Sequence, residues 1–177
     1  MRKEILFYLI LILNISNLYA QHISFLGIQL GQSETVTDRL IRQRGFDYIG
    51  RAYEPANMYE GTFWMYKTVG ILARTYNSKV TEIIVTPKSS IYNKTEDFNK
   101  LINGLNKKYG KNYTKVNKPY LIAYVWIVNG GSIEATKFHN IGNENRGITI
   151  SLRYIDKSSI LYKNPRMSYK RNKANDL

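Results

Sequence analysis

The chain has 177 residues and a formal net charge of +13, with 26 lysine and arginine residues against 13 aspartate and glutamate residues. Its length is sufficient for one domain that buries a core without help from metals or disulfides. It contains no cysteine and only two histidines, which excludes disulfides, thiolate zinc sites and a cysteine nucleophile. A histidine-based centre would have very few parts, so we predict no metal site and no cofactor.

The first segment, residues 1–20, has the pattern of a secretory signal peptide. Basic residues precede an apolar run over residues 5–13, and Ala20 offers a small residue at the cleavage point. The run is too short to cross a bilayer core of about 30 Å as a helix. The sequence therefore predicts export, to the periplasm or the medium, of a mature chain that begins at Gln21 and has no transmembrane segment.

After the cleavage point the chain predicts a strand and then a helix. Residues 22–30 have the apolar residues of a short strand. The helix is expected over residues 34–44, with Ser33 or Thr35 as its cap and Gly45 at its end.

Three β-like runs follow this helix. They are rich in aromatic and β-branched residues, and Asn77 with Ser78 predicts a tight turn between the last two. The runs cover residues 59–66, 68–76 and 79–86.

The second half of the chain shows the same order of elements. Asn93 followed by Glu96 resembles a capping box, and Gly110 ends the predicted helix. Apolar residues recur at helical spacing between them, at Phe98, Leu101, Ile102, Leu105 and Tyr109. Three more strands are expected over residues 120–128, 132–138 and 147–154.

The two halves also share a weak internal repeat. LIRQRGFDY at residues 40–48 matches LNKKYGKNY at residues 105–113 at the leucine, a basic residue, the glycine and the tyrosine. Three further pairs of identical residues lie at a constant separation along the sequence: Trp64 with Trp126, Ile71 with Ile133, and Ala73 with Ala135. A tandem αβββ repeat would form one antiparallel sheet with both helices on the same face. We therefore predict a single two-layer α+β sandwich over residues 21–156.

The segment FLGIQLG at residues 25–31, followed by a short helix and the αβββ order, resembles two groups of proteins. One comprises uncharacterised small exported proteins of Gram-negative bacteria, and the other has the β-lactamase-inhibitor-protein-like fold. The resemblance covers about residues 23–156 and implies an exported scaffold whose open sheet face contacts a protein. Members with the inhibitor fold typically have disulfides, which this chain lacks, so inhibition of a β-lactamase is not carried over.

The sequence contains none of the common catalytic motifs: no G-x-S-x-G elbow, no H-E-x-x-H and no phosphate-binding glycine loop. Glu96 and Asp97 fit the start of a helix, and Glu82 and Glu134 are expected on solvated strand faces. We predict that the protein is not an enzyme and has no catalytic residues. A hydrolase of unfamiliar type, with a pocket that gathers His139 or carboxylates, ranks last.

Fifteen tyrosines and two tryptophans are many for this chain. In residues 120–128 Tyr124 and Trp126 fall on one face and aliphatic residues on the other, so both faces are apolar. If the aliphatic face lies against the helices, the aromatic face belongs to the open side of the sheet, where such side chains dominate interface hot spots. The predicted partner-binding residues are Tyr124, Trp126, Arg153, Trp64, Tyr66, Arg74 and Tyr76. The alternative is that both tryptophans are core residues.

The chain ends in a basic tail, residues 157–177, with little to bury after residues 160–162. This composition predicts a flexible extension. Its tyrosine and basic residues are interleaved, but this pattern is too common to identify a nucleic-acid-binding protein. We do not expect nucleic acid as a partner.

These observations favour an exported, non-enzymatic binding protein whose open sheet face contacts a protein partner, as an inhibitor or immunity-type protein does. The net positive charge would steer an acidic partner. The alternative is an envelope-associated protein that binds anionic polymer or lipid through its basic surface and tail.

Overall fold

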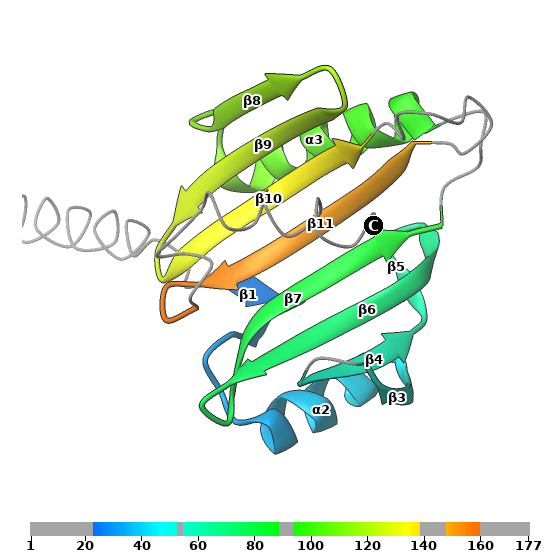
Figure 1. Cartoon of the computed structure of the whole chain (residues 1–177), viewed down its shortest axis with the longest axis vertical. Helices are drawn as coiled ribbons and strands as arrows, with labels where there is room; N and C mark the ends of the chain where they lie inside the picture. Colours follow the sequence, from blue (N-terminus) through cyan, green and yellow to red (C-terminus); the bar gives the residue numbers. More distant parts are fainter. Residues whose placement is uncertain (1–22, 53–54, 89–93, 139–147, 160–177) are drawn as a thin grey trace, which may run out of the picture.

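The computed structural model describes residues 23–52, 55–88, 94–138 and 148–159, in which two helices pack on one face of a large antiparallel sheet (Figure 1). The two-layer α+β sandwich expected from the sequence is confirmed. The predicted signal peptide, both histidines and the tail beyond Ser159 lie outside the described residues.

Among the described residues, the first half has one helix and seven strands. In chain order they are β1 (Ser24–Phe25), β2 (Ile28–Gln29), α2 (Glu34–Gln43), β3 (Asp47–Arg51), β4 (Ala56–Glu60), β5 (Thr62–Phe63), β6 (Tyr66–Tyr76) and β7 (Lys79–Pro87).

Local sequence explains several of these boundaries. The Ser33 hydroxyl accepts a hydrogen bond from the Val36 N–H at 3.4 Å and caps α2, and Gly45 follows the helix with a φ of +84°. Asn77 and Ser78 form the predicted turn between β6 and β7, with φ values of +49° and +58°. Both residues therefore adopt the left-handed conformation that two-residue hairpin loops require.

Two predictions for the first half were wrong. Residues 22–30 do not form one strand, because the chain turns at Leu26 and Gly27, both with positive φ, and β1 pairs with β2 as a hairpin. Residues 59–66 do not form one strand either, because the chain breaks at Gly61 between β4 and β5. A Cβ atom at Gly61 would lie 2.5 Å from the Phe46 ring, so only glycine fits this bend.

The described part of the second half has one helix and four strands, which are α3 (Lys94–Tyr109), β8 (Thr114–Lys118), β9 (Leu121–Val128), β10 (Gly131–Phe138) and β11 (Thr149–Asp156). The predicted apolar stripe of α3 is buried except at Tyr109, which is partly buried, and Gly110 follows the helix with a φ of +80°. Strands β3 and β8 were not predicted, so six main strands were too few. Each is an outer strand of the sheet, and each is short and largely exposed.

The main sheet has the order β3-β4-β6-β7-β11-β10-β9-β8, and β5 pairs with β6 beside this path. All neighbouring strands are antiparallel, so each half is a four-strand meander preceded by its helix. The meanders join where β7 pairs with β11, with Val85 opposite Leu152 and Ile83 opposite Tyr154. The two halves therefore share one continuous sheet.

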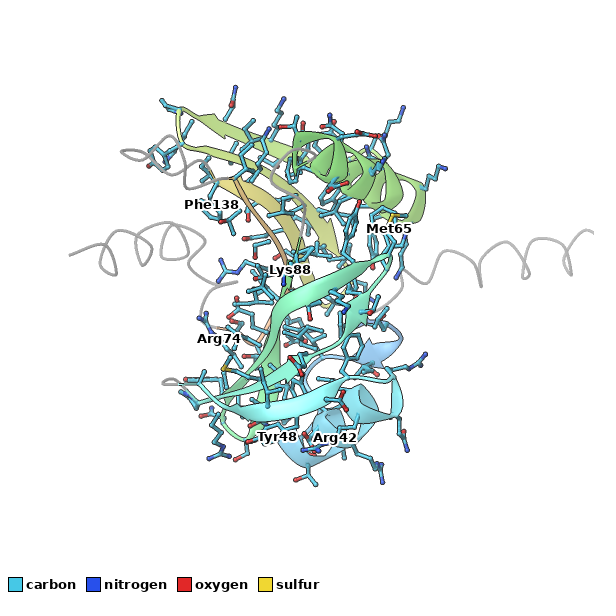
Figure 2. All side chains as sticks on the ribbon, turned by 90° about the vertical axis from the view of Figure 1, so that its right-hand side faces the viewer. Arg42, Tyr48, Met65, Arg74, Lys88 and Phe138 are labelled. Carbon is cyan, nitrogen blue, oxygen red and sulfur yellow. The ribbon has the colours of Figure 1, made fainter. Side chains whose placement is uncertain are left out.

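The hydrophobic core lies between the sheet and the two helices, which both lie behind the sheet in Figure 1. On β11 every second residue faces the helices, and Ile150, Leu152 and Tyr154 all belong to this core. The face of the sheet away from the helices is called the open face below. By strand register, it includes Arg74 and Phe138, which Figure 2 shows on the side of the sheet opposite Met65.

The tandem repeat remains a prediction. Ile71 and Ala73 lie on β6 and Ile133 and Ala135 lie on β10, each within the core. The proposed tryptophan pair does not fit this scheme. Trp126 lies opposite Ile133 on β9, whereas Tyr59, not Trp64, lies opposite Ile71.

Candidate binding surfaces

The structure does not bring the seven predicted partner-binding residues together on one surface. Trp64 and Tyr66 lie at the turn between β5 and β6, next to α3. Tyr76 is exposed at the far end of β6. Arg74 and Arg153 lie on the open face. Tyr124 and Trp126 point toward the core under the helices.

Trp126 is a core residue, so its predicted position on the open face was wrong. The alternative, that both tryptophans are core residues, holds for Trp126 but not for Trp64, which is 49% exposed. The Trp126 side chain is 1% exposed, and its indole Nε1 donates a hydrogen bond to the Gly110 carbonyl at 2.9 Å. Tyr124 stacks on it with ring centroids 6.2 Å apart, and Tyr113 meets both rings edge-on. The large aromatic face of β9, rather than its aliphatic face, therefore fills the space beneath α3.

The open face carries a row of alternating charges across four neighbouring strands, which we call the charge row: Arg74 on β6, Glu82 on β7, Arg153 on β11 and Glu134 on β10. Glu82 is 2% exposed and binds both arginines, at 3.1 Å from Arg74 and 2.7 Å from Arg153. Arg153 also lies 3.8 Å from Glu134. The expectation that Glu82 and Glu134 are solvated was wrong, because each carboxylate is buried beside a guanidinium group from another strand.

Burial also affects the titration of the charge row. Loss of solvent raises the pKa of the Glu134 carboxyl above its ordinary value; Arg153 opposes this rise and the Glu82 carboxylate adds to it. Because Glu82 binds both arginines and Glu134 lies near Arg153, the row has little net charge to offer a partner. The charge row is thus a structural network and not the pair of free arginine contacts that the sequence suggested.

The turn between β5 and β6 exposes a large aromatic side chain at the surface. It consists of Trp64 and Met65, which we call the Trp64 turn, and their side chains are 49% and 62% exposed. Phe63 pairs with Tyr66, so the Trp64 turn is a two-residue hairpin loop. Trp64 has a φ of +61°, a conformation that strongly favours glycine or asparagine. A bulky aromatic residue is thus held in a costly backbone conformation at the surface.

Packing from α3 fixes the orientation of the Trp64 ring. The ring meets Tyr66 edge-on at 6.2 Å, and the Tyr66 hydroxyl donates a hydrogen bond to Asp97 at 2.6 Å. Burial and this carboxylate raise the pKa of Tyr66 to about 12. A Cβ atom at Gly104 of α3 would lie 3.5 Å from the indole, so the helix backbone passes close beneath the ring. From the sequence, Asp97 was assigned only to the helix dipole.

A polar cluster that sequence reasoning missed joins α2 to β3 and β4. Glu34 binds Arg51 at 2.9 Å and also accepts from Asn57. Asp38 similarly accepts from Tyr59 at 2.8 Å and pairs with Arg42 at 2.9 Å. Only the spacing of Asp38 and Arg42 on one helix could have indicated any part of it. Its charges pair with one another and hold α2 to the edge of the sheet.

Lysines concentrate at the opposite edge of the sheet. Residues 98–133 contain six lysines and no aspartate or glutamate. Five of the six lie at the end of α3 and along β8, where all are exposed, and we call them the lysine end: Lys107, Lys108, Lys111, Lys115 and Lys118. In Figure 1 β8 and α3 lie together at the top of the molecule. This edge carries a strong positive field that falls with salt.

Within the described ranges, no three histidine or acidic side chains gather as a metal site would require. Neither helix there has the length and apolarity needed to span a bilayer. The chain matches no family model, no curated protein and no solved structure.

Proposed function

We propose that this protein is an exported, non-enzymatic binding protein, and that it contacts a protein partner through the Trp64 turn. The observation that carries the proposal is the positive φ of a half-exposed tryptophan. Backbone strain of this kind costs about 1–3 kcal/mol and concentrates at functional sites. Glycine would avoid the cost, so the side chain at this position is the feature that needs an explanation.

The packing around Trp64 supports a role in recognition. Tyr66 and Gly104 hold the indole against α3 before any partner arrives, so binding would lose little side-chain entropy there. Tryptophan is enriched among interface hot spots, and Met65 beside it is a flexible apolar residue suited to uneven surfaces. Together they form a small apolar contact that a partner can cover.

The cellular setting of the proposal rests on the N-terminal segment. Residues 1–20 have the signal-peptide pattern, so the partner would be met in the periplasm or the medium. The mechanism would be steric: the bound protein blocks or sequesters its partner, as an inhibitor or immunity-type protein does. The net positive charge would raise the rate of encounter with an acidic partner.

The test is capture of partners from envelope and culture fractions by the mature chain and two variants. Trp64→Ala removes the proposed contact. Tyr76→Ala is the matched control, because Tyr76 is equally exposed, at 49%, but lies at the other end of β6. Circular dichroism would confirm that both variants are folded.

We expect one protein to bind the unchanged chain and Tyr76→Ala, and to be lost with Trp64→Ala. Truncating a hot-spot tryptophan costs at least about 2 kcal/mol, or roughly thirtyfold in affinity. If Trp64→Ala retains the same partner as the control, the Trp64 turn is not the contact. If no protein is retained by the unchanged chain, the proposal of a protein partner fails.

The lysine end favours a second candidate function, which is binding of an anionic polymer or lipid in the cell envelope. Five exposed lysines without a neighbouring acidic residue in the sequence give a field that attracts phosphate-bearing surfaces. Such binding should collapse between low and moderate salt, whereas contact through the Trp64 turn should weaken only modestly.

Vesicles with and without anionic phospholipid provide the test of this second function. A triple variant, Lys107→Gln, Lys111→Gln and Lys115→Gln, should release the protein from anionic vesicles. The matched control removes three exposed basic residues from the first half: Arg39→Gln, Arg44→Gln and Lys79→Gln. Equal loss with both triple variants would mean that net charge alone drives binding.

A further inference from the structure

Part of the open face of the sheet is buried where an uncovered sheet would be exposed. Both helices lie on the other face, and within the described ranges no helix or strand lies over this one (Figure 1). Even so, Glu82 is 2% exposed and Ile155 is 1% exposed. Large side chains in the middle of an uncovered sheet face retain contact with water, so other atoms must lie above them.

Strand register shows that these buried residues form one continuous area. Ile155 lies between Glu82 and Ser132, and Thr136 lies beside Ala123. We call the area the covered band, and its residues, all buried on the open face, are Glu82, Ile155, Ser132, Thr136, Ala123 and Leu121. None of its apolar members belongs to the hydrophobic core under the helices.

The covered band has clear limits on the same face. Ile127 is next to Ser132 in the register but is 67% exposed. Met58 and Leu72, over β4 and β6, keep part of their surface in solvent. The cover is therefore a strip over β9, β10 and β11 that ends at β7. It is about as wide as one or two chain segments, which is much narrower than a second layer of helices.

We propose that the C-terminal segment of this chain, residues 160–177, lies along the open face and covers this band. The segment starts next to the covered band. It follows β11, which is a central strand of the sheet and ends at Asp156. The Ser159 N–H donates a hydrogen bond to the Asp156 carbonyl at 2.9 Å, and Ser159 itself is buried. The chain thus turns at the margin of the covered band rather than leaving the domain.

Length and composition fit this occupant. Eighteen residues extend up to about 60 Å, whereas four neighbouring strands span only about 20 Å. The segment begins with Ile160, Leu161 and Tyr162, which supply apolar surface for the apolar members of the band. The N-terminal segment is a poorer fit, because the chain enters at Ile23 within the core on the helix side.

The raised pKa of Glu134 supports the same arrangement, since it reflects loss of solvent on this face.

Docking of the C-terminal segment has a consequence for binding. The open face is occupied from within the chain, so a partner could reach it only by displacing residues 160–177. This inference does not depend on the Trp64 turn, which lies on the other side of the sheet.

The absence of cysteine from the chain permits a direct accessibility test. Ala123 on the open face and Ala135 on the helix face are both 0% exposed, so Ala123→Cys and Ala135→Cys are matched probes. Each would be placed in the mature chain and in a chain that ends at Ser159. The rate of maleimide labelling is measured, with Ile127→Cys as the exposed reference.

We expect truncation to speed labelling of Ala123→Cys by at least about tenfold, toward the rate of the exposed reference, and to leave Ala135→Cys protected. Equal labelling of Ala123→Cys in both chains would overturn the proposal, whether the shared rate is slow or fast. If the shortened chain does not fold, a nitroxide on Tyr169→Cys in the full mature chain replaces the test. It should broaden the amide signals of Ser132 and Thr136, and unbroadened signals there would equally overturn the proposal.

Discussion

The two tryptophans of this protein occupy regions with opposite properties. Trp126 lies on a central stretch of β9, stacks with Tyr124 and is buried under α3. Trp64 lies in a two-residue turn, is half exposed and is held in a conformation that disfavours large residues. Residue type alone therefore does not identify a binding surface. The backbone position relative to the helices decides whether an aromatic side chain stabilises the fold or is available to a partner.

The largest effect should come from removing the buried tryptophan. Trp126→Ala loses a fully buried ring and the hydrogen bond to Gly110, so we expect the free energy of unfolding to fall by about 3–5 kcal/mol. Urea denaturation measures this change. The same measurement on Trp64→Ala should show a much smaller loss. Equal losses for the two variants would remove the distinction between the regions.

The charge row should be the next most sensitive feature. Glu82→Gln leaves two arginines beside a neutral group, and loss of one partner from a buried ion pair costs about 3–5 kcal/mol. Both arginines keep some solvent contact, so we expect about 2–3 kcal/mol. Glu60→Gln, at an exposed position on β4, is the control. A loss no larger than that of the control would show that the row contributes nothing to stability.

Glu134 makes stability depend on pH. Its pKa is raised in the folded chain, so the folded state retains a proton that the unfolded state releases. The free energy of unfolding should therefore fall as pH rises from the ordinary carboxyl pKa through the raised one. Glu134→Gln should remove this fall, because an amide does not titrate in either state. Urea denaturation across this pH range, with Glu60→Gln as control, would show parallel curves if Glu134 were not responsible.

The smallest effect concerns the backbone at Trp64. Alanine and glycine both remove the indole, but only glycine accepts a φ of +61° without strain. Trp64→Gly should therefore be more stable than Trp64→Ala by about 1 kcal/mol. The matched pair Thr62→Gly and Thr62→Ala on the adjoining strand should show the reverse order. If alanine were the more stable residue at position 64, the turn would not be strained.

Local signals allowed much of the fold to be predicted. Ser33 and Gly45 delimited α2, the apolar stripe identified α3, and Asn77 with Ser78 marked a hairpin turn. The outer strands β3 and β8 escaped prediction because each is only five residues long and mostly exposed, so neither shows the alternation of a half-buried strand.

The candidate sites were harder to predict because they depend on contacts between distant residues. Both faces of β9 are apolar, so its alternation did not show which face lies beneath α3. Glu82 is buried by an arginine 71 positions later, and no local pattern reports that pairing. The conformation of Trp64 follows from the pairing of β5 with β6, whereas the sequence predicted one continuous strand over residues 59–66 with no turn at Trp64.

Acrylamide quenching of tryptophan fluorescence tests the division between the two regions most directly. Trp126→Phe leaves Trp64 as the only tryptophan, and Trp64→Phe leaves only Trp126. We expect red-shifted, strongly quenched emission from the first protein and blue-shifted, protected emission from the second. Protected emission from Trp64 in the folded mature chain would contradict the assignment of the Trp64 turn as an exposed binding surface.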